Sequence, residues 1–308
     1  MVAAGLAEQR VRSCRQALRF VRQLYRATLA EAFGTKALKN VRQAMIEAGR
    51  SHKLINKDMH RIRGMFRWAV EEEMLSVRVH ERLMRLRGLR KGRSAAKETP
   101  KVRPVLVEHV HAVVPHLPPT VAAMIQLQLL CGARPQEITT LRPCEITDLG
   151  NGAWYYHPYA HKMEHMDRDK VIVLGPQAQA VLRPWLDRDP ESYCFAPAEA
   201  SAWQLRRQCK KPATTAAADA PAKKRTKRVP GLRYTRHSYR VAVQRACRRA
   251  GVPRWSPRQL RHTRASMVRE QYGLEASKAV LGHADTKVTE IYAQRDLELA
   301  QQVMREIG

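Results

Sequence analysis

The feature that most limits how this chain can fold is a basic stretch, GLRKGRSAAKETPKVRP, at residues 88–104. Apolar residues follow no regular spacing there, so neither a helix nor a strand would have a face to bury. Such composition is typical of a linker between domains. A chain of 308 residues is long enough for two hydrophobic cores. We therefore predict two domains, residues 1–88 and 104–308, joined by a basic linker at 89–103.

The first domain has the periodicity of helices. Apolar residues recur at helical spacing in two segments, 11–25 and 62–70. Phe33-Gly34 can end the first helix, and Ser51 is suited to cap the N-terminus of the second. These patterns predict a small helical bundle with a polar and basic surface.

The second domain begins where the composition becomes more apolar, at Val105. Residues 121–130 predict a buried helix, and residues 236–250 predict a second helix. Between them, residues 154–159 and 170–174 are rich in aromatic and β-branched residues and predict a short β-hairpin. The predicted fold class is mainly α: an N-terminal helical bundle, then an α+β domain with a small antiparallel sheet.

Two further segments of the second domain have distinct patterns. Residues 210–231 are low in complexity and bounded by prolines, which predicts a flexible basic loop. Residues 297–308 carry an apolar stripe that predicts a short C-terminal tail helix. The stripe consists of Leu297, Ala300, Met304 and Ile307.

Charge indicates the class of partner. The chain has 56 Lys and Arg against 28 Asp and Glu, which gives a net charge of +28. Self-repulsion of this size does not help a protein to fold, so it points to a polyanion such as nucleic acid. A ribosomal or architectural protein would have a similar charge, so charge alone does not say what is done to the nucleic acid.

Other classes of protein are disfavoured by the same sequence. It has no run of about twenty apolar residues that would span a membrane. The N-terminus becomes basic before any apolar stretch develops, unlike a signal peptide. The 6 cysteines include no C-x-x-C pair, so we expect free thiols in a reducing cytoplasm. Histidines 157, 161 and 165 are four apart, but Pro158 and strand-like flanks argue against a helical metal site.

Two motifs place arginines where they can reach an anion. In CGARPQEITTL, Arg134 stands before Pro135, which can begin a helix, and Glu137 is close enough to orient the guanidinium. In SPRQLRHTRAS, Arg258 and Arg261 are three apart and share one face of a helix. Each motif also has an ordinary explanation, a local ion pair in the first and a solvated basic face in the second.

The order of these motifs, followed by Gly282-His283 and a tyrosine nine residues later, resembles the active site of tyrosine recombinases, the phage-integrase family. That family has G-x-R-x-x-E, a lysine on a β-hairpin, His-x-x-Arg, Leu-Gly-His and then the tyrosine. The matching residues here are Gly132, Arg134, Glu137, Lys162, Arg261, His283 and Tyr292. Arg258 stands where the family usually has histidine. Residues 51–75 likewise resemble the family's core-binding domain.

The resemblance implies a site-specific recombinase that cuts and rejoins DNA through a covalent 3′-phosphotyrosyl link, with neither metal nor ATP. Arg134 and Arg261 would clamp the scissile phosphate, and Tyr292 would attack it. Lys162 would protonate the departing 5′-oxygen, and His283 would assist as a hydrogen-bond donor or base.

Two more residues have implied roles. Glu137 would orient Arg134 from behind. Arg258 can donate a hydrogen bond to the phosphate, but arginine keeps its proton and cannot share acid or base duty as histidine can.

The implied partners are double-stranded DNA, a homo-tetramer on two duplexes that is a monomer or weak dimer when free, and accessory DNA-bending proteins. The implied location is cytoplasmic, on the nucleoid of a prokaryote. The tail helix would pass to a neighbouring protomer, although such a helix can equally pack on its own domain. Two alternative functions remain at this point: a topoisomerase IB-like nicking-closing enzyme, and a non-catalytic DNA-binding relative, to which Arg258 points.

Overall fold

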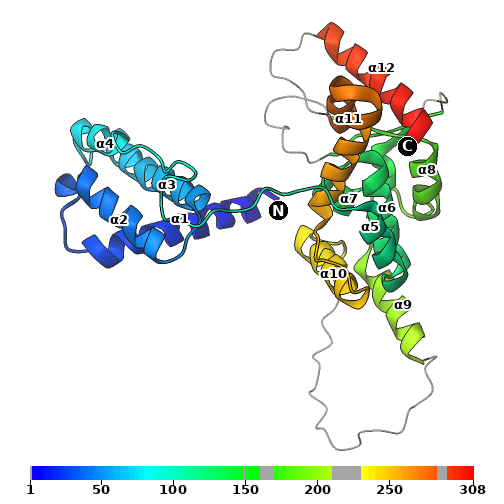
Figure 1. The fold of residues 1–308 in the computed structure, drawn as a ribbon, viewed down its shortest axis with the longest axis horizontal. Coiled ribbons are helices and arrows are strands. Elements are labelled where there is room, and N and C mark those ends of the chain that lie inside the picture. The colour runs from blue at the N-terminus through cyan, green and yellow to red at the C-terminus, as the bar shows by residue number, and fades with distance from the viewer. Residues whose placement is uncertain (1, 149, 151, 160–169, 210–229, 283–289) are drawn as a thin grey trace, which may run out of the picture. The chain divides into compact units, whose positions relative to one another are not determined.

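The computed structural model describes residues 2–148, 150, 152–159, 170–209, 230–282 and 290–308 (Figure 1). Within the helices, the side chains of residues 2–7, 9, 207–209 and 290–298 are outside this description. Lys162, His283 and residues 210–229 of the predicted basic loop lie outside the described residues. The chain divides into two compact units, Met1–Lys101 and Val102–Gly308.

The first unit is a bundle of helices, as the periodicity predicts. Its elements are α1 (Val2–Tyr25), a 3-10 turn (Ala30–Ala32), α2 (Thr35–Glu47), α3 (His52–Glu71) and α4 (Val77–Met84). Each helix from α1 to α4 buries apolar side chains in one core. The rings of Phe33 and Phe66 stack in that core, with centroids 5.1 Å apart. Phe33 follows the 3-10 turn, so it joins this turn to α3.

The chain after α4 packs against the same bundle. Asn56 exchanges hydrogen bonds with the backbone of Leu89, at 2.8 and 2.9 Å. Ser51 forms an isolated β-bridge with Lys97, and Ala96 is 4% exposed. Contacts therefore assign residues up to Lys101 to the first unit, and the stretch that composition predicts as a linker includes residues packed on the bundle.

The second unit is mainly helical. Its helices are α5 (Val107–Val113), α6 (Pro119–Cys131), α7 (Pro135–Thr140), α8 (Pro176–Leu182), α9 (Pro197–Cys209), α10 (Arg236–Arg249), α11 (Pro257–Leu281) and α12 (Glu290–Ile307). The apolar helix α6 is central, because α7, α8, α9, α10 and α11 all pack on it. This arrangement explains why its apolar residues lack a single face: most sides of the helix are covered. None of the helices in the described part of the chain has the length and apolar character that a membrane span requires.

The second unit also contains a small antiparallel sheet in the order β1-β2-β3. Its strands are β1 (Ile146–Asp148), β2 (Trp154–Tyr156) and β3 (Ile172–Leu174). β2 and β3 are the two strands of the predicted hairpin. The sequence pattern does not predict β1, because three residues of which two are exposed give no periodic signal. The Tyr156 hydroxyl donates a hydrogen bond to the carbonyl of Glu137 at 2.8 Å, which fixes the sheet to α7.

Helix α12 begins at Glu290 and continues to Ile307, so Tyr292 and the predicted tail belong to one helix. In the single chain this helix packs on its own unit, against α11, α8 and β3. Ala300 and Met304 of the predicted stripe are buried there. Helix α11 is kinked at Gly273, whose φ of 85° is in the left-handed region.

Gly132 ends α6 with a φ of 66°, and a Cβ placed on it would lie 2.7 Å from Leu281 Cδ2. We expect Gly132→Ala to lower the free energy of unfolding, because the φ alone costs about 1–2 kcal/mol and overpacking typically adds about 1–3. The matched control is Gly251→Ala, which has a φ of 68° but no atom within 4 Å of the added Cβ. Urea denaturation measures both, and equal losses would mean that the packing around Gly132 adds nothing.

Candidate active site

The start of α7 fixes the position of Arg134. Pro135 occupies the first helical position and holds the preceding residue in an extended conformation, with φ −72° and ψ 148° at Arg134. The side chain of Glu137 folds back toward the start of α7, where its Oε2 accepts a hydrogen bond from the backbone N–H of Arg134 at 2.6 Å. Its Oε1 accepts from Nη1 of Arg134 at 3.0 Å, so the ion pair that the spacing suggests is present. The side chain of Arg134 stays 34% exposed and can meet a ligand.

A lysine that the sequence interpretation did not select completes this pair. Lys170 stands two residues before β3, and its Nζ lies 2.6 Å from Oε1 of Glu137. Both side chains are buried, at 8% and 4% exposure. One feature of the sequence indicates that Lys170 is buried. It directly precedes the apolar residues of KVIVL, so its aliphatic stem can pack with the strand against the core.

Arg261 joins the cluster from α11. Its Nη1 donates to the carbonyl of Gly132 at 2.8 Å and its Nη2 to the carbonyl of Leu281 at 2.7 Å. Burial, with a smaller contribution from the charge of Arg134, lowers the pKa of Arg261 to about 10, so it remains charged at neutral pH. Arg258, three residues earlier on the same helix, is exposed.

The cluster of Arg134, Glu137, Lys170 and Arg261 holds three cations and one carboxylate. Burial alone would raise the pKa of Glu137, but the charge and hydrogen bond of Lys170, together with Arg134, lower it. Glu137 is therefore ionised at neutral pH, and two positive charges in the cluster are not neutralised by it. An arginine pair with excess positive charge suits an oxyanion such as a phosphate diester.

The other predicted site residues are described less completely. Tyr292 lies in the first turn of α12, but its side chain is outside the described residues. Lys162 and His283 lie outside them altogether, as do His161 and His165. The structure thus brings Arg134, Glu137 and Arg261 together, and the roles predicted for the six candidate catalytic residues and Glu137 stay predictions.

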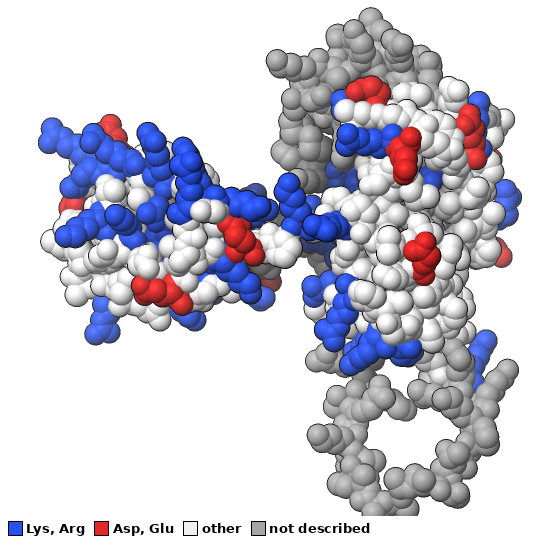
Figure 2. Space-filling model, viewed as in Figure 1, with Lys and Arg blue, Asp and Glu red and all other residues white. Residues whose placement is uncertain are grey.

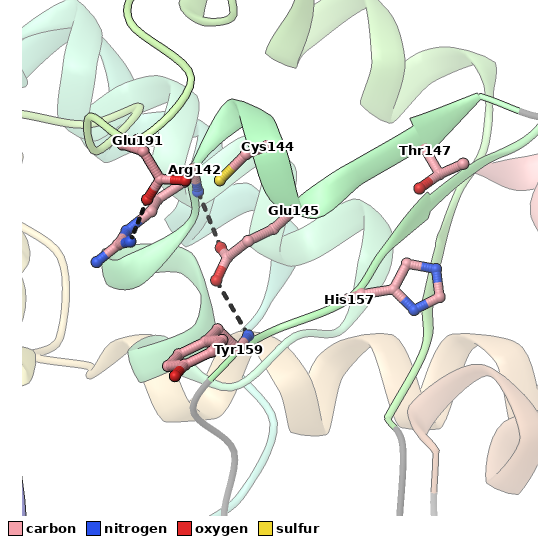
Figure 3. A pocket seen from close by; sticks show the side chains of 7 residues that line it. All are labelled: Arg142, Cys144, Glu145, Thr147, His157, Tyr159 and Glu191. Carbon is pink, nitrogen blue, oxygen red and sulfur yellow. Dashed lines mark hydrogen bonds and ion pairs between the residues drawn. The ribbon is translucent and has the colours of Figure 1, made fainter.

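A pocket of about 690 Å³ lies elsewhere, beside β1, and contains no residue of the cluster (Figure 3). Its walls are Arg142, Cys144, Glu145, Thr147, His157, Tyr159 and Glu191. Glu145 accepts from the backbone N–H groups of Arg142 and Tyr159, both at 3.0 Å. Glu191 pairs with the Arg142 guanidinium at 2.9 Å. Both carboxylates in this pocket are thus already engaged within the protein, and we assign it no function.

The model of the phage integrase family matches residues 105–298, which is more than half of the chain. The protein belongs to the phage integrase family of tyrosine recombinases. The match spans every residue of the cluster as well as Tyr292. None of the curated proteins compared with this sequence matches it.

Solved structures share the fold of this family member. A λ integrase fragment, as a dimer bound to a COC′ core site, has a TM-score of 0.56 at 13% identity, over 90% of this chain and 89% of that one. The Tn1549 transposon integrase in complex with circular intermediate DNA gives 0.53 at 13%, over 91% of each chain. The XerH site-specific recombinase bound to difH gives 0.52 at 13%, over 94% of this chain and 74% of that one.

Because Lys170 is buried, we expect the stability of the protein to depend on the protonation of this side chain. Burial lowers its pKa from 10.5 to about 8, although the charge of Glu137 opposes the shift. Between these pH values Lys170 still holds its proton in the unfolded chain but has released it in the folded chain, so this residue contributes a rise in the free energy of unfolding with pH. We expect this rise, on the order of 2 to 3 kcal/mol, to vanish in Lys170→Met.

Urea denaturation from pH 7.5 to 10.5 measures this difference between wild type and variant. Lys278→Met is the control, because its side chain is 36% exposed beside Glu275. A parallel pH dependence in wild type and Lys170→Met would contradict the assignment.

Proposed function

We propose that this protein is a site-specific DNA recombinase that cuts and rejoins strands through a covalent 3′-phosphotyrosyl intermediate. The observation that carries the proposal is the cluster around Glu137, where Arg134 and Arg261 converge in a member of the phage integrase family. Two arginines, held from behind by a carboxylate and by backbone carbonyls, can bind both non-bridging oxygens of a phosphate.

In the proposed reaction, Arg134 and Arg261 hold the scissile phosphate and stabilise the charge that develops on its oxygens. The hydroxyl oxygen of Tyr292 forms a bond to phosphorus as the bond from phosphorus to the 5′-oxygen breaks. Lys162 gives the departing 5′-oxygen a proton, and His283, acting as a base, takes the proton of the tyrosine hydroxyl. Religation is the reverse reaction with a 5′-hydroxyl, and since the phosphotyrosyl bond keeps the energy of the diester, it needs no ATP.

Three competing tyrosines of the second unit, Tyr234, Tyr239 and Tyr272, are poorly suited to attack DNA. Tyr239 is 0% exposed, and its hydroxyl donates a hydrogen bond to the side-chain carbonyl of Gln128. Tyr234 is 6% exposed, and burial raises its pKa to about 12. The hydroxyl of Tyr272 donates a hydrogen bond to the carboxylate of Glu306 at 2.7 Å. These contacts support Tyr292, at the start of α12, as the nucleophile.

The proposed partner is double-stranded DNA bound by a tetramer. The λ integrase structures include a dimer on a core site and a tetramer on a Holliday junction, and this chain has the same fold. The net charge of +28 supports a polyanionic partner. On the visible face of the first unit, Lys and Arg side chains are widespread and few Asp and Glu lie among them (Figure 2). Bound phosphates would release counterions, so affinity would fall steeply with salt.

The experiment that tests the function uses two labelled duplexes carrying the target site, one of them nicked so that the cleaved strand end diffuses away. A recombinase forms a covalent adduct on the nicked duplex and, with intact sites, products joined from both duplexes. An adduct without joined products would favour a topoisomerase-like enzyme. Failure to form an adduct would leave a DNA-binding protein without catalysis.

We expect Tyr292→Phe to abolish adduct formation while the affinity for DNA changes less than about twofold, because only the nucleophilic oxygen is lost. Gel separation of labelled DNA measures the adduct, and a mobility shift measures binding. Tyr159→Phe is the matched control, because Tyr159 is 80% exposed and lies outside the cluster, and it should still form the adduct. An adduct with Tyr292→Phe would assign the nucleophile to another residue.

A further inference from the structure

A second arginine of α11 is buried without an acidic partner. Arg264 is 3% exposed, and no carboxylate of the described residues pairs with its guanidinium. Its Nη2 donates to the carbonyl of Ile307 at 3.1 Å and lies 3.5 Å from the sulfur of Met304. Burial lowers the pKa of Arg264, so the site keeps a charge at a cost. A cation held in this way calls for an explanation beyond packing.

The last turn of α12 offers this explanation, because the carbonyls at a helix C-terminus lack partners and attract a cation. Arg264, on the neighbouring helix α11, is the cation that binds these carbonyls. Two more contacts hold the same turn: the Ala178 N–H donates to the carbonyl of Gly308 at 2.6 Å, and the Tyr272 hydroxyl donates to the carboxylate of Glu306 at 2.7 Å. Gly175 leaves no space, since a Cβ there would lie 1.8 Å from the carbonyl oxygen of Met304.

These contacts act on a helix that also contains Tyr292. α12 is one helix from Glu290 to Ile307, so a shift or rotation at its end is transmitted to its start. At a rise of ~1.5 Å per residue, roughly 22 Å separates Tyr292 from Ile307 along the axis. Arg264 stands one turn after Arg261 on α11, so α11 holds the phosphate-clamping arginine and the end of the nucleophile helix together.

We propose that Arg264 is a positioning residue that sets the register of α12 against α11, and thereby the place of Tyr292 relative to Arg261. The inference rests on the proposed function, because it needs Tyr292 to be the nucleophile. It concerns the attack step alone. DNA binding and protonation of the leaving oxygen use other side chains.

The test compares Arg264→Met and Arg264→Lys in the full chain. Single-turnover adduct formation is measured on the nicked substrate and on one with sulfur in place of the bridging 5′-oxygen, a better leaving group that needs no acid. We expect Arg264→Met to slow attack by about 10-fold to 100-fold on both substrates, with DNA affinity unchanged. Arg264→Lys, which keeps a cation, should recover part of the rate. A variant of Lys162 should instead be rescued by the sulfur substrate.

Gly175→Ala is an independent variant, because it displaces the same helix end without removing a charge. It keeps the idea testable if Arg264→Met does not fold, and it should slow attack in the same way. The controls are Gly231→Ala, whose nearest atom to the new Cβ is 3.8 Å away, and Arg305→Met, which removes an exposed cation of α12. Both should cleave at the wild-type rate.

Several results would overturn the proposal. Wild-type rates in Arg264→Met or in Gly175→Ala would do so, and so would recovery of Arg264→Met on the sulfur substrate. Equal rates in Arg264→Met and Arg264→Lys would show that the positive charge at position 264 has no part in positioning α12. Absence of any adduct with the wild-type protein would instead overturn the proposed function, and this inference with it.

Discussion

The candidate site depends on one buried carboxylate. Glu137 is 3% exposed, and a charge so placed would cost several kcal/mol without partners. Two donors of Arg134 and one of Lys170 offset that cost. They come from the start of α7 and from the approach to β3, so the carboxylate ties a helix to the sheet. The same contacts hold the Arg134 guanidinium at the surface before any ligand binds, which reduces the ordering that binding requires.

The end of α6 connects this carboxylate to the rest of the unit. Gly132 turns the chain from α6 toward α7, and its carbonyl accepts from Arg261. Its α-carbon faces Leu281 and Arg264, leaving no space for a side chain. The absence of a side chain at Gly132 thus lets the end of α6 pack closely against α11, directly before α7 begins. Since Arg264 also holds the end of α12, the phosphate clamp and the helix containing Tyr292 share a common support.

The sequence predicted the parts of this arrangement that depend on neighbouring residues. The ion pair of Arg134 and Glu137 follows from their spacing of three across Pro135. The helical segments at residues 11–25, 62–70, 121–130 and 236–250 and the β2–β3 hairpin follow from periodicity and composition. Lys170 and Arg264 could not be found in this way. Their partners lie 33 and 43 residues away, and a cation beside apolar residues has the same local pattern whether it is buried or solvated.

The most direct test of the account identifies the residue that becomes linked to DNA. The adduct is trapped on a nicked duplex, digested with protease and nuclease, and analysed by mass spectrometry for a peptide that carries a nucleotide. The account predicts a single modified peptide, with the 3′-phosphate attached to the oxygen of Tyr292. Attachment to any other residue, or a cleaved strand with no linked peptide, would contradict it.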